Sequence, residues 1–123
     1  MAPVPSNRPT ALVTAPFRGP GVERLAAVAD LVVDPWLDHR PLRLYGADAL
    51  AERIDAEGAT IVVCEGDVVA GPVLERPLLA IGSARGDPTN VDVPAATAAG
   101  IPVLHTPGRN ADAVAELTVG LLL

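Results

Sequence analysis

Ala47-Asp-Ala-Leu-Ala-Glu-Arg-Ile-Asp-Ala-Glu-Gly-Ala-Thr-Ile-Val-Val63 is the stretch that indicates the fold, because it places a helix directly before a strand. Its first half repeats apolar residues at helical spacing, and Gly58 is a typical stop signal. The apolar helix positions are Ala47, Leu50, Ala51 and Ile54. Its second half, residues 60–63, is a short apolar run typical of a buried strand. The stretch therefore predicts one helix–strand unit of an α/β fold.

The same alternation extends in both directions along the chain. Four further apolar runs predict strands at residues 11–15, 31–33, 78–81 and 101–104. Helical spacing or capping residues predict helices at 21–29, about 72–76, 92–99 and from 110 onward. Strands that alternate with helices indicate a parallel sheet with helices on both faces. We expect a flavodoxin-like, doubly wound five-stranded sheet of order 2-1-3-4-5, with the strand that contains Pro102 at an edge.

Composition excludes several classes of function. The net charge is −6, and the nine basic residues are scattered arginines, so we expect no nucleic-acid partner. No apolar run reaches membrane-spanning length, so we expect no membrane partner. Cys64 is the only cysteine and has no partner for an internal disulfide, which favours a reducing, cytoplasmic location.

The two ends of the chain differ from its middle. Residues 1–10 are rich in Pro and read as a flexible leader, and residues 11–109 read as one domain. From residue 110 a helix is expected whose later part, 114–123, is apolar on nearly every face. Such a helix either docks onto its own sheet or runs between domains. We expect the second, with residues 110–123 as the start of a crossover helix into a further domain.

Ligands of parallel sheets bind at the carboxyl ends of the strands, where three loops qualify here: 64–67, 83–90 and 105–110. Arg85 can grip a carboxylate with two parallel hydrogen bonds, and Gly86 allows close backbone approach. Asn110 begins a helix whose N-terminus favours an anion. Together these residues are suited to hold a small carboxylic acid. The residues alone favour the alternative, an ordinary turn with a solvated Arg and an Asn that caps the last helix, just as Asp92 is expected to cap the preceding one.

The other reactive residues carry weaker signals. His39 and His105 have no acidic residue obviously placed to orient them, so both are interpreted as structural or exposed. Cys64 ends an apolar strand and is interpreted as a small apolar filler. The sequence contains no metal-ligand spacing, nucleophile elbow, Walker loop or GxGxxG. No metal site is expected.

One segment resembles a known family. It reads Asn90-Val-Asp92, then Ala98-Ala-Gly-Ile-Pro-Val103, then Thr106-Pro-Gly108 with Asn110, and ends with Val114-Ala-Glu-Leu-Thr118. These pieces, in this order and spacing, are similar to the D-isomer-specific 2-hydroxyacid dehydrogenases. The rest of the chain fits that family only by the order and spacing of its strands.

The resemblance implies the substrate-binding domain of a two-domain, NAD-dependent (or NADP-dependent) oxidoreductase that acts on a small 2-hydroxy or 2-keto acid. It implies a homodimer when intact. The family's second domain supplies the GxGxxG loop, a catalytic Arg, a supporting Glu and a His that moves the hydroxyl proton, and none of these has a matching position here. The 123-residue chain is therefore expected to hold no catalytic residue, to bind no cofactor alone and to be inactive alone.

Two positions carry over from the family. Gly86 matches the middle of the Gly-x-Gly loop that approaches substrate and cofactor, and Asn110 matches an Asn near substrate and nicotinamide. Arg85 and Asp87 stand where that loop usually has its two glycines, and Ala84-Arg-Gly86 resembles the sequence of a subgroup at this place. Cys64 and Glu65 stand where many members have Arg-Ser.

Two other functions occur on chains of this length and topology. A phosphoacceptor receiver domain needs an acidic pair after the first strand and a Lys after the fifth, and this chain has neither. A non-catalytic small-carboxylate-binding or interaction module of the same fold remains an alternative.

Overall fold

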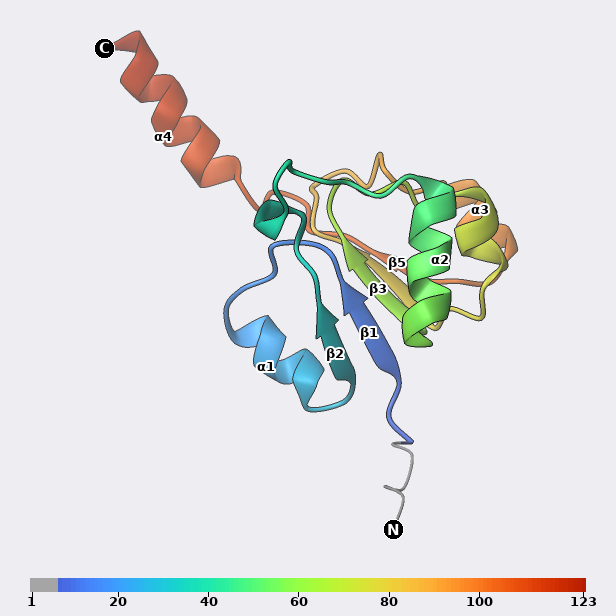
Figure 1. The fold of residues 1–123 in the computed structure, drawn as a ribbon. Helices are drawn as coiled ribbons and strands as arrows, with labels where there is room; N and C mark the ends of the chain where they lie inside the picture. The colour runs from blue at the N-terminus through green and yellow to red at the C-terminus, as the bar shows by residue number, and fades with distance from the viewer. Residues whose placement is uncertain (1–6) are drawn as a thin grey trace.

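The computed structural model describes residues 7–123, and residues 1–6 of the predicted leader lie outside the described part. Five parallel strands form one sheet in the order β2-β1-β3-β4-β5, which confirms the flavodoxin-like topology (Figure 1). The strands are β1 (Thr10–Val13), β2 (Asp30–Val33), β3 (Ile61–Cys64), β4 (Ala80–Ser83) and β5 (Val103–Leu104). Thr10, the last residue of the predicted leader, is thus the first residue of β1.

The strands lie where the sequence predicts them, with shifts of one or two residues. β4 begins two residues later than expected, because Ala80 pairs with Ile61 in the parallel register. β5 is confirmed at the edge and is only two residues long. Pro102 precedes it and accepts a hydrogen bond from the amide of Ile81 at 3.0 Å. A strand that begins after a proline loses little at an edge, where one side of its backbone has no partner strand.

Helix α2 (Ala47–Glu57) has the predicted bounds, and Gly58 ends it in the left-handed conformation at φ 63°. Helix α3 (Val93–Ala98) is capped as predicted, because the Asp92 side chain accepts from the Ala95 amide at 3.1 Å. Helix α1 (Pro20–Ala26) is shorter than the predicted 21–29. The remaining elements are two 3₁₀ turns, η1 (Trp36–Asp38) and η2 (Gly71–Glu75), and helix α4 (Ala111–Leu122).

The core lies between the sheet and the layer formed by α2, η2 and α3. Leu12, Val62 and Ile81 of the three central strands are fully buried there, together with Leu50 and Ile54 of α2. Burial of aliphatic side chains between a sheet and its helices is the main stabilising term of such a domain. This layer holds the carboxyl ends of β1, β3 and β4 in one place.

The other face of the sheet is covered less completely than expected. Helix α1 lies on that side next to β2 (Figure 1). Beside β3, β4 and β5, by contrast, Val63, Gly82 and Leu104 border a cavity of about 340 Å³. Leu104 is 60% exposed. Helix α1 therefore covers part of that face beside β2, and the prediction of helices on both faces holds only in part for β4 and β5.

Helix α4 projects away from the sheet, as Figure 1 shows at the C-terminal end. No residue of α4 is buried, and Leu117 and Leu121 are largely exposed. The alternative that this helix docks onto its own sheet is therefore wrong for this structure. In the described part of the chain, no helix combines the length and the hydropathy needed to cross a bilayer.

Candidate functional site

The three loops singled out in the sequence meet at the carboxyl edge of the sheet. The amide of Ala84, after β4, donates to the carbonyl of Cys64, at the end of β3, at 2.8 Å. The amide and hydroxyl of Thr106, after β5, both donate to the carbonyl of Arg85, at 2.9 and 3.1 Å. Nδ1 of His105 lies 2.9 Å from the carbonyl oxygen of Gly86. These bonds join the loops into one surface.

Gly86 lies against the turn that leads into α4. A Cβ atom added to Gly86 would stand 3.8 Å from the amide nitrogen of Gly108 and 3.8 Å from the carbonyl oxygen of Thr106. The Arg85 side chain is half-buried, and its guanidinium has no hydrogen-bond or ion-pair partner within residues 7–123. Within residues 7–123, Arg85 thus has an unpaired guanidinium and is followed by a glycine that borders the turn before α4.

Asn110 is at the N-cap position of α4, but its side chain makes no capping hydrogen bond, so the predicted cap is wrong. Its backbone has φ −116° and ψ 12°, outside the extended region in which a capping side chain reaches the first-turn amides. The amide side chain is exposed. Asn110 lies two residues beyond Gly108, whose amide nitrogen borders Gly86. Its place in the same cleft as Gly86 stays a prediction of the resemblance.

A buried carboxylate, which sequence reasoning missed, lies at this edge of the sheet after β3. Asp67 is fully buried, and its two oxygens accept hydrogen bonds from the Thr14 hydroxyl and, at 2.7 Å, from the Tyr45 amide. Thr14 follows β1 and Asp67 follows β3, so the bond joins two neighbouring strand ends. The signal in the sequence is a polar residue at or shortly after the end of each apolar run, which by itself does not distinguish burial from exposure.

Asn90 extends this network to the β4 loop. Its amide donates to the Asp67 carbonyl at 2.9 Å and to the Cys64 sulfur at 3.3 Å, and its carbonyl oxygen accepts from the Ser83 hydroxyl at 2.9 Å. Cys64 is fully buried, and burial raises the pKa of its thiol to about 11, which the Asn90 hydrogen bond only partly offsets. The thiol is therefore protonated at neutral pH, and the interpretation of Cys64 as a filler is confirmed.

His39 has an acidic partner that the sequence did not reveal. Its Nε2 lies 2.8 Å from Oδ1 of Asp34, and the Tyr45 hydroxyl donates to Oδ2 of Asp34 at 2.8 Å. Burial alone would raise the pKa of Asp34. Hydrogen bonds from Tyr45 and His39, with the charges of His39 and Arg53, outweigh that effect and lower the pKa below its usual value. The Asp34 carboxylate therefore holds the loop after β2 in place through its bonds to His39 and Tyr45.

Glu65 links two further segments at the same edge. Its Oε2 accepts from the indole nitrogen of Trp36 at 2.9 Å, and its Oε1 accepts from Nη2 of Arg109 at 3.0 Å. The Glu65 side chain is 19% exposed and that of Arg109 is 44% exposed. The loop after β2, the end of β3 and the turn before α4 are therefore tied together.

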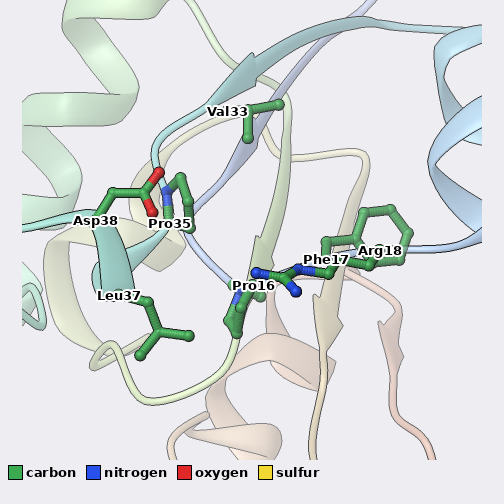
Figure 2. A pocket seen from close by; sticks show the side chains of 8 residues that line it. Pro16, Phe17, Arg18, Val33, Pro35, Leu37 and Asp38 are labelled. Carbon is green, nitrogen blue, oxygen red and sulfur yellow. The ribbon is translucent and has the colours of Figure 1, made fainter.

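A separate hollow of about 220 Å³ lies beside β2, where the loops after β1 and β2 face each other (Figure 2). Pro16, Phe17 and Arg18 come from the first loop, and Pro35, Leu37 and Asp38 from the second. Sequence reasoning did not foresee it. Among the described residues, no three His, Cys, Asp or Glu side chains are grouped as ligands for a metal ion.

Residues 47–119 match the sequence model of a protein family described as "D-isomer specific 2-hydroxyacid dehydrogenase, catalytic domain". The Bacillus subtilis (strain 168) protein YoaD, whose name places it among the 2-hydroxyacid dehydrogenases, is 40% identical over 90% of this chain and 33% of its own length. The glyoxylate reductase of Thermofilum pendens is 35% identical over 94% of this chain and 33% of its own length.

Solved structures share the fold. The NAD⁺-bound 3-phosphoglycerate dehydrogenase of Entamoeba histolytica matches 94% of this chain and 38% of its own chain, with a TM-score of 0.68 and 22% identity. The PH0520 protein of Pyrococcus horikoshii OT3 matches 92% and 32%, with a TM-score of 0.66 and 25% identity. The chain spans about a third of the length of the curated relatives described above. It belongs to the D-isomer specific 2-hydroxyacid dehydrogenase family.

Proposed function

We propose that this chain is the substrate-binding part of an NAD-dependent (or NADP-dependent) oxidoreductase that interconverts a D-2-hydroxy acid and its 2-keto acid. The observation that carries the proposal is the meeting of Arg85 and Gly86 with the turn that leads to Asn110. Membership of the family supports the reaction class. The share of the relatives' length that the chain spans is consistent with a second domain in the intact protein.

In this proposal each residue has a distinct part. The Arg85 guanidinium holds the substrate carboxylate through two parallel hydrogen bonds. Gly86 lets substrate and cofactor approach the backbone, and the Asn110 amide contacts substrate and nicotinamide. The cofactor takes or gives a hydride when bound. We propose that the acid and base groups come from the second domain, because His105 contacts the Gly86 carbonyl and His39 is held by Asp34.

Two measurements test the reaction. The 123-residue chain mixed with NADH and a panel of 2-keto acids should give no turnover, and oxidation of NADH would contradict the proposed need for a second domain. The coding DNA beyond Leu123 should encode a strand, a GxGxxG and a helix within about thirty residues. The longer product should oxidise NADH with a 2-keto acid, and Arg85→Gln should raise KM for the acid more than Arg85→Lys does.

The alternative is a module that binds small carboxylates without catalysis. The unpaired Arg85 favours binding in either case. Titration of the longer product with oxamate and with NADH separates the two functions: the enzyme binds both, whereas the module binds oxamate alone and gives no turnover.

We further propose that the intact protein is a cytoplasmic homodimer. The single, buried cysteine fits a reducing compartment. The exposed apolar side chains of α4 need a protein surface to cover them. These side chains are Val114, Leu117, Val119, Leu121 and Leu122. Light scattering after size exclusion checks the oligomeric state, and a monomeric intact protein would contradict the dimer.

A further inference from the structure

The direction of α4 depends on very few contacts. Within residues 7–123, every hydrogen bond from residues 107–123 stays inside the turn and helix, except the bond from Arg109 to Glu65. The preceding residue, Thr106, is tied to the Arg85 carbonyl by its amide and hydroxyl. Hydrogen bonds therefore fix the chain up to Thr106. Beyond it, within residues 7–123, the Arg109 side chain makes the one hydrogen bond back to the domain, and the Gly108 backbone borders Gly86.

Glu65 is well placed to receive that side chain. Glu65 directly follows Cys64, the last residue of β3. Cys64 is fully buried and bonded to Asn90, so the backbone of Glu65 is anchored in the core. Its second oxygen is held by the Trp36 indole, which fixes the orientation of the carboxylate. Because both of its oxygens are bonded, the Glu65 carboxylate holds the Arg109 guanidinium in one orientation. A flexible ion pair between two surface side chains does not do this.

We infer that Glu65 is a positioning residue, which acts through Arg109 to set the direction in which α4 leaves the domain and thereby the place of Asn110. Gly108 has a φ of 72°, so the turn bends sharply between the bonded Thr106 and Arg109. A change in the Glu65–Arg109 contact shifts the residue directly after Arg109. The inference rests on the proposed function only where it assigns Asn110 to the substrate cleft.

Spin labels measure this direction without any activity. Glu52 on α2 and Glu116 on α4 are exposed, and replacing both by Cys gives one distance between the domain and the helix. Native Cys64 is fully buried and reacts slowly with the label. We expect one narrow distance distribution in this labelled parent by pulsed electron resonance.

Glu65→Gln and Arg109→Gln should each widen the distribution by roughly twofold or more, because the helix then samples several directions. Arg109→Lys keeps the charge and should restore most of the narrow distribution. Asp55→Asn is the matched control: it removes a similar ion pair, with Arg76 at 2.8 Å, which joins α2 to the residue after η2 and does not involve the turn before α4. This control should leave the distribution unchanged.

The inference would be overturned if the distance distributions of Glu65→Gln and Arg109→Gln were as narrow as that of Asp55→Asn. Circular dichroism checks folding. Arg109→Gln keeps the test decisive if Glu65→Gln unfolds, because the Arg109 side chain is 44% exposed, against 19% for Glu65. In the longer product, Glu65→Gln should lower kcat at unchanged thermal stability. The distance measurement tests the role of Glu65 and does not depend on turnover. If the proposed enzyme function is wrong, turnover is absent but the distance distributions still change as expected.

Discussion

The hydroxyl of Thr14 donates a hydrogen bond to the carboxylate of Asp67, although 53 residues separate them in the chain. Both side chains are fully buried at the carboxyl ends of neighbouring strands. A buried carboxylate is tolerated only where donors satisfy it, and here the Tyr45 amide supplies the second donor. This hydrogen bond is thus a polar link inside the core, and its removal is expected to loosen the loops after β1 and β3 together.

Asp67→Ala should lower the free energy of unfolding by about 2–4 kcal/mol, because two buried donors lose their acceptor. Asp67→Asn should cost less, since the amide oxygen still accepts one bond. Urea denaturation measures both. Asp87→Asn is the control, because Asp87 is exposed and should change stability by less than about 0.5 kcal/mol. Equal stabilities of Asp67→Ala and the control would refute the structural role.

Asp34 should make stability depend on acid pH. Its pKa is lowered in the folded state, so the carboxylate form is favoured by folding. Its contribution is present above the ordinary pKa of 3.8 and is lost as the pH falls through the lower, folded value. Tyr45→Phe removes one of the hydrogen bonds that lower the pKa and should weaken this dependence. Urea denaturation between pH 7 and pH 3 measures the dependence, and identical curves for parent and Asp34→Asn would contradict it.

Cys64 should resist thiol reagents in the folded chain. Burial raises its pKa from 9.0 to about 11, so the thiolate is scarce at pH 8. Reaction with Ellman's reagent should be at least about 100-fold slower than in urea, where the thiol is exposed. The raised pKa also predicts that the stability contribution of the protonated thiol, complete below pH 9.0, is lost as the pH rises toward 11. Rapid reaction of the native chain would show that Cys64 is accessible.

Gly86→Ala should separate ligand binding from stability. The added Cβ would stand in ordinary contact, at 3.8 Å from the nearest backbone atoms, so the change in the free energy of unfolding should stay below about 0.5 kcal/mol. In the longer product, the affinity for a 2-keto acid should fall by about tenfold, because the methyl group occupies the approach to the backbone. Gly58→Ala, at φ 63°, should show the reverse: about 1 kcal/mol of lost stability and unchanged affinity.

Helix α4 should contribute little to the stability of the domain. Leu117→Ala should change the free energy of unfolding by less than about 0.5 kcal/mol, because that side chain is 65% exposed. Leu50→Ala, at a fully buried position of α2, should cost about 2–5 kcal/mol. Thermal denaturation of the two variants under the same conditions compares them. A large loss for Leu117→Ala would show that α4 packs on the domain or on a second copy in solution.

Local patterns predicted most of the fold because they act over a few residues. The spacing of α2, its stop at Gly58 and the cap at Asp92 are each set by neighbours in the chain. Pro102 made an edge position for the next strand predictable, because proline is disfavoured in central strands. The capping role of Asn110 failed for the same local reason, since residue type alone does not set φ and ψ at the start of a helix that meets no other element.

The sequence by itself determined the alternation of strands and helices, the order of the sheet and the three loops at its carboxyl edge. Only the tertiary structure decided which polar residues meet there, because side chains such as Thr14 and Asp67, or Trp36, Glu65 and Arg109, come from segments distant in the chain. Hydrophobic periodicity records which face of an element is buried. It carries no information on which buried donor finds which acceptor, and that pairing depends on the register of neighbouring strands.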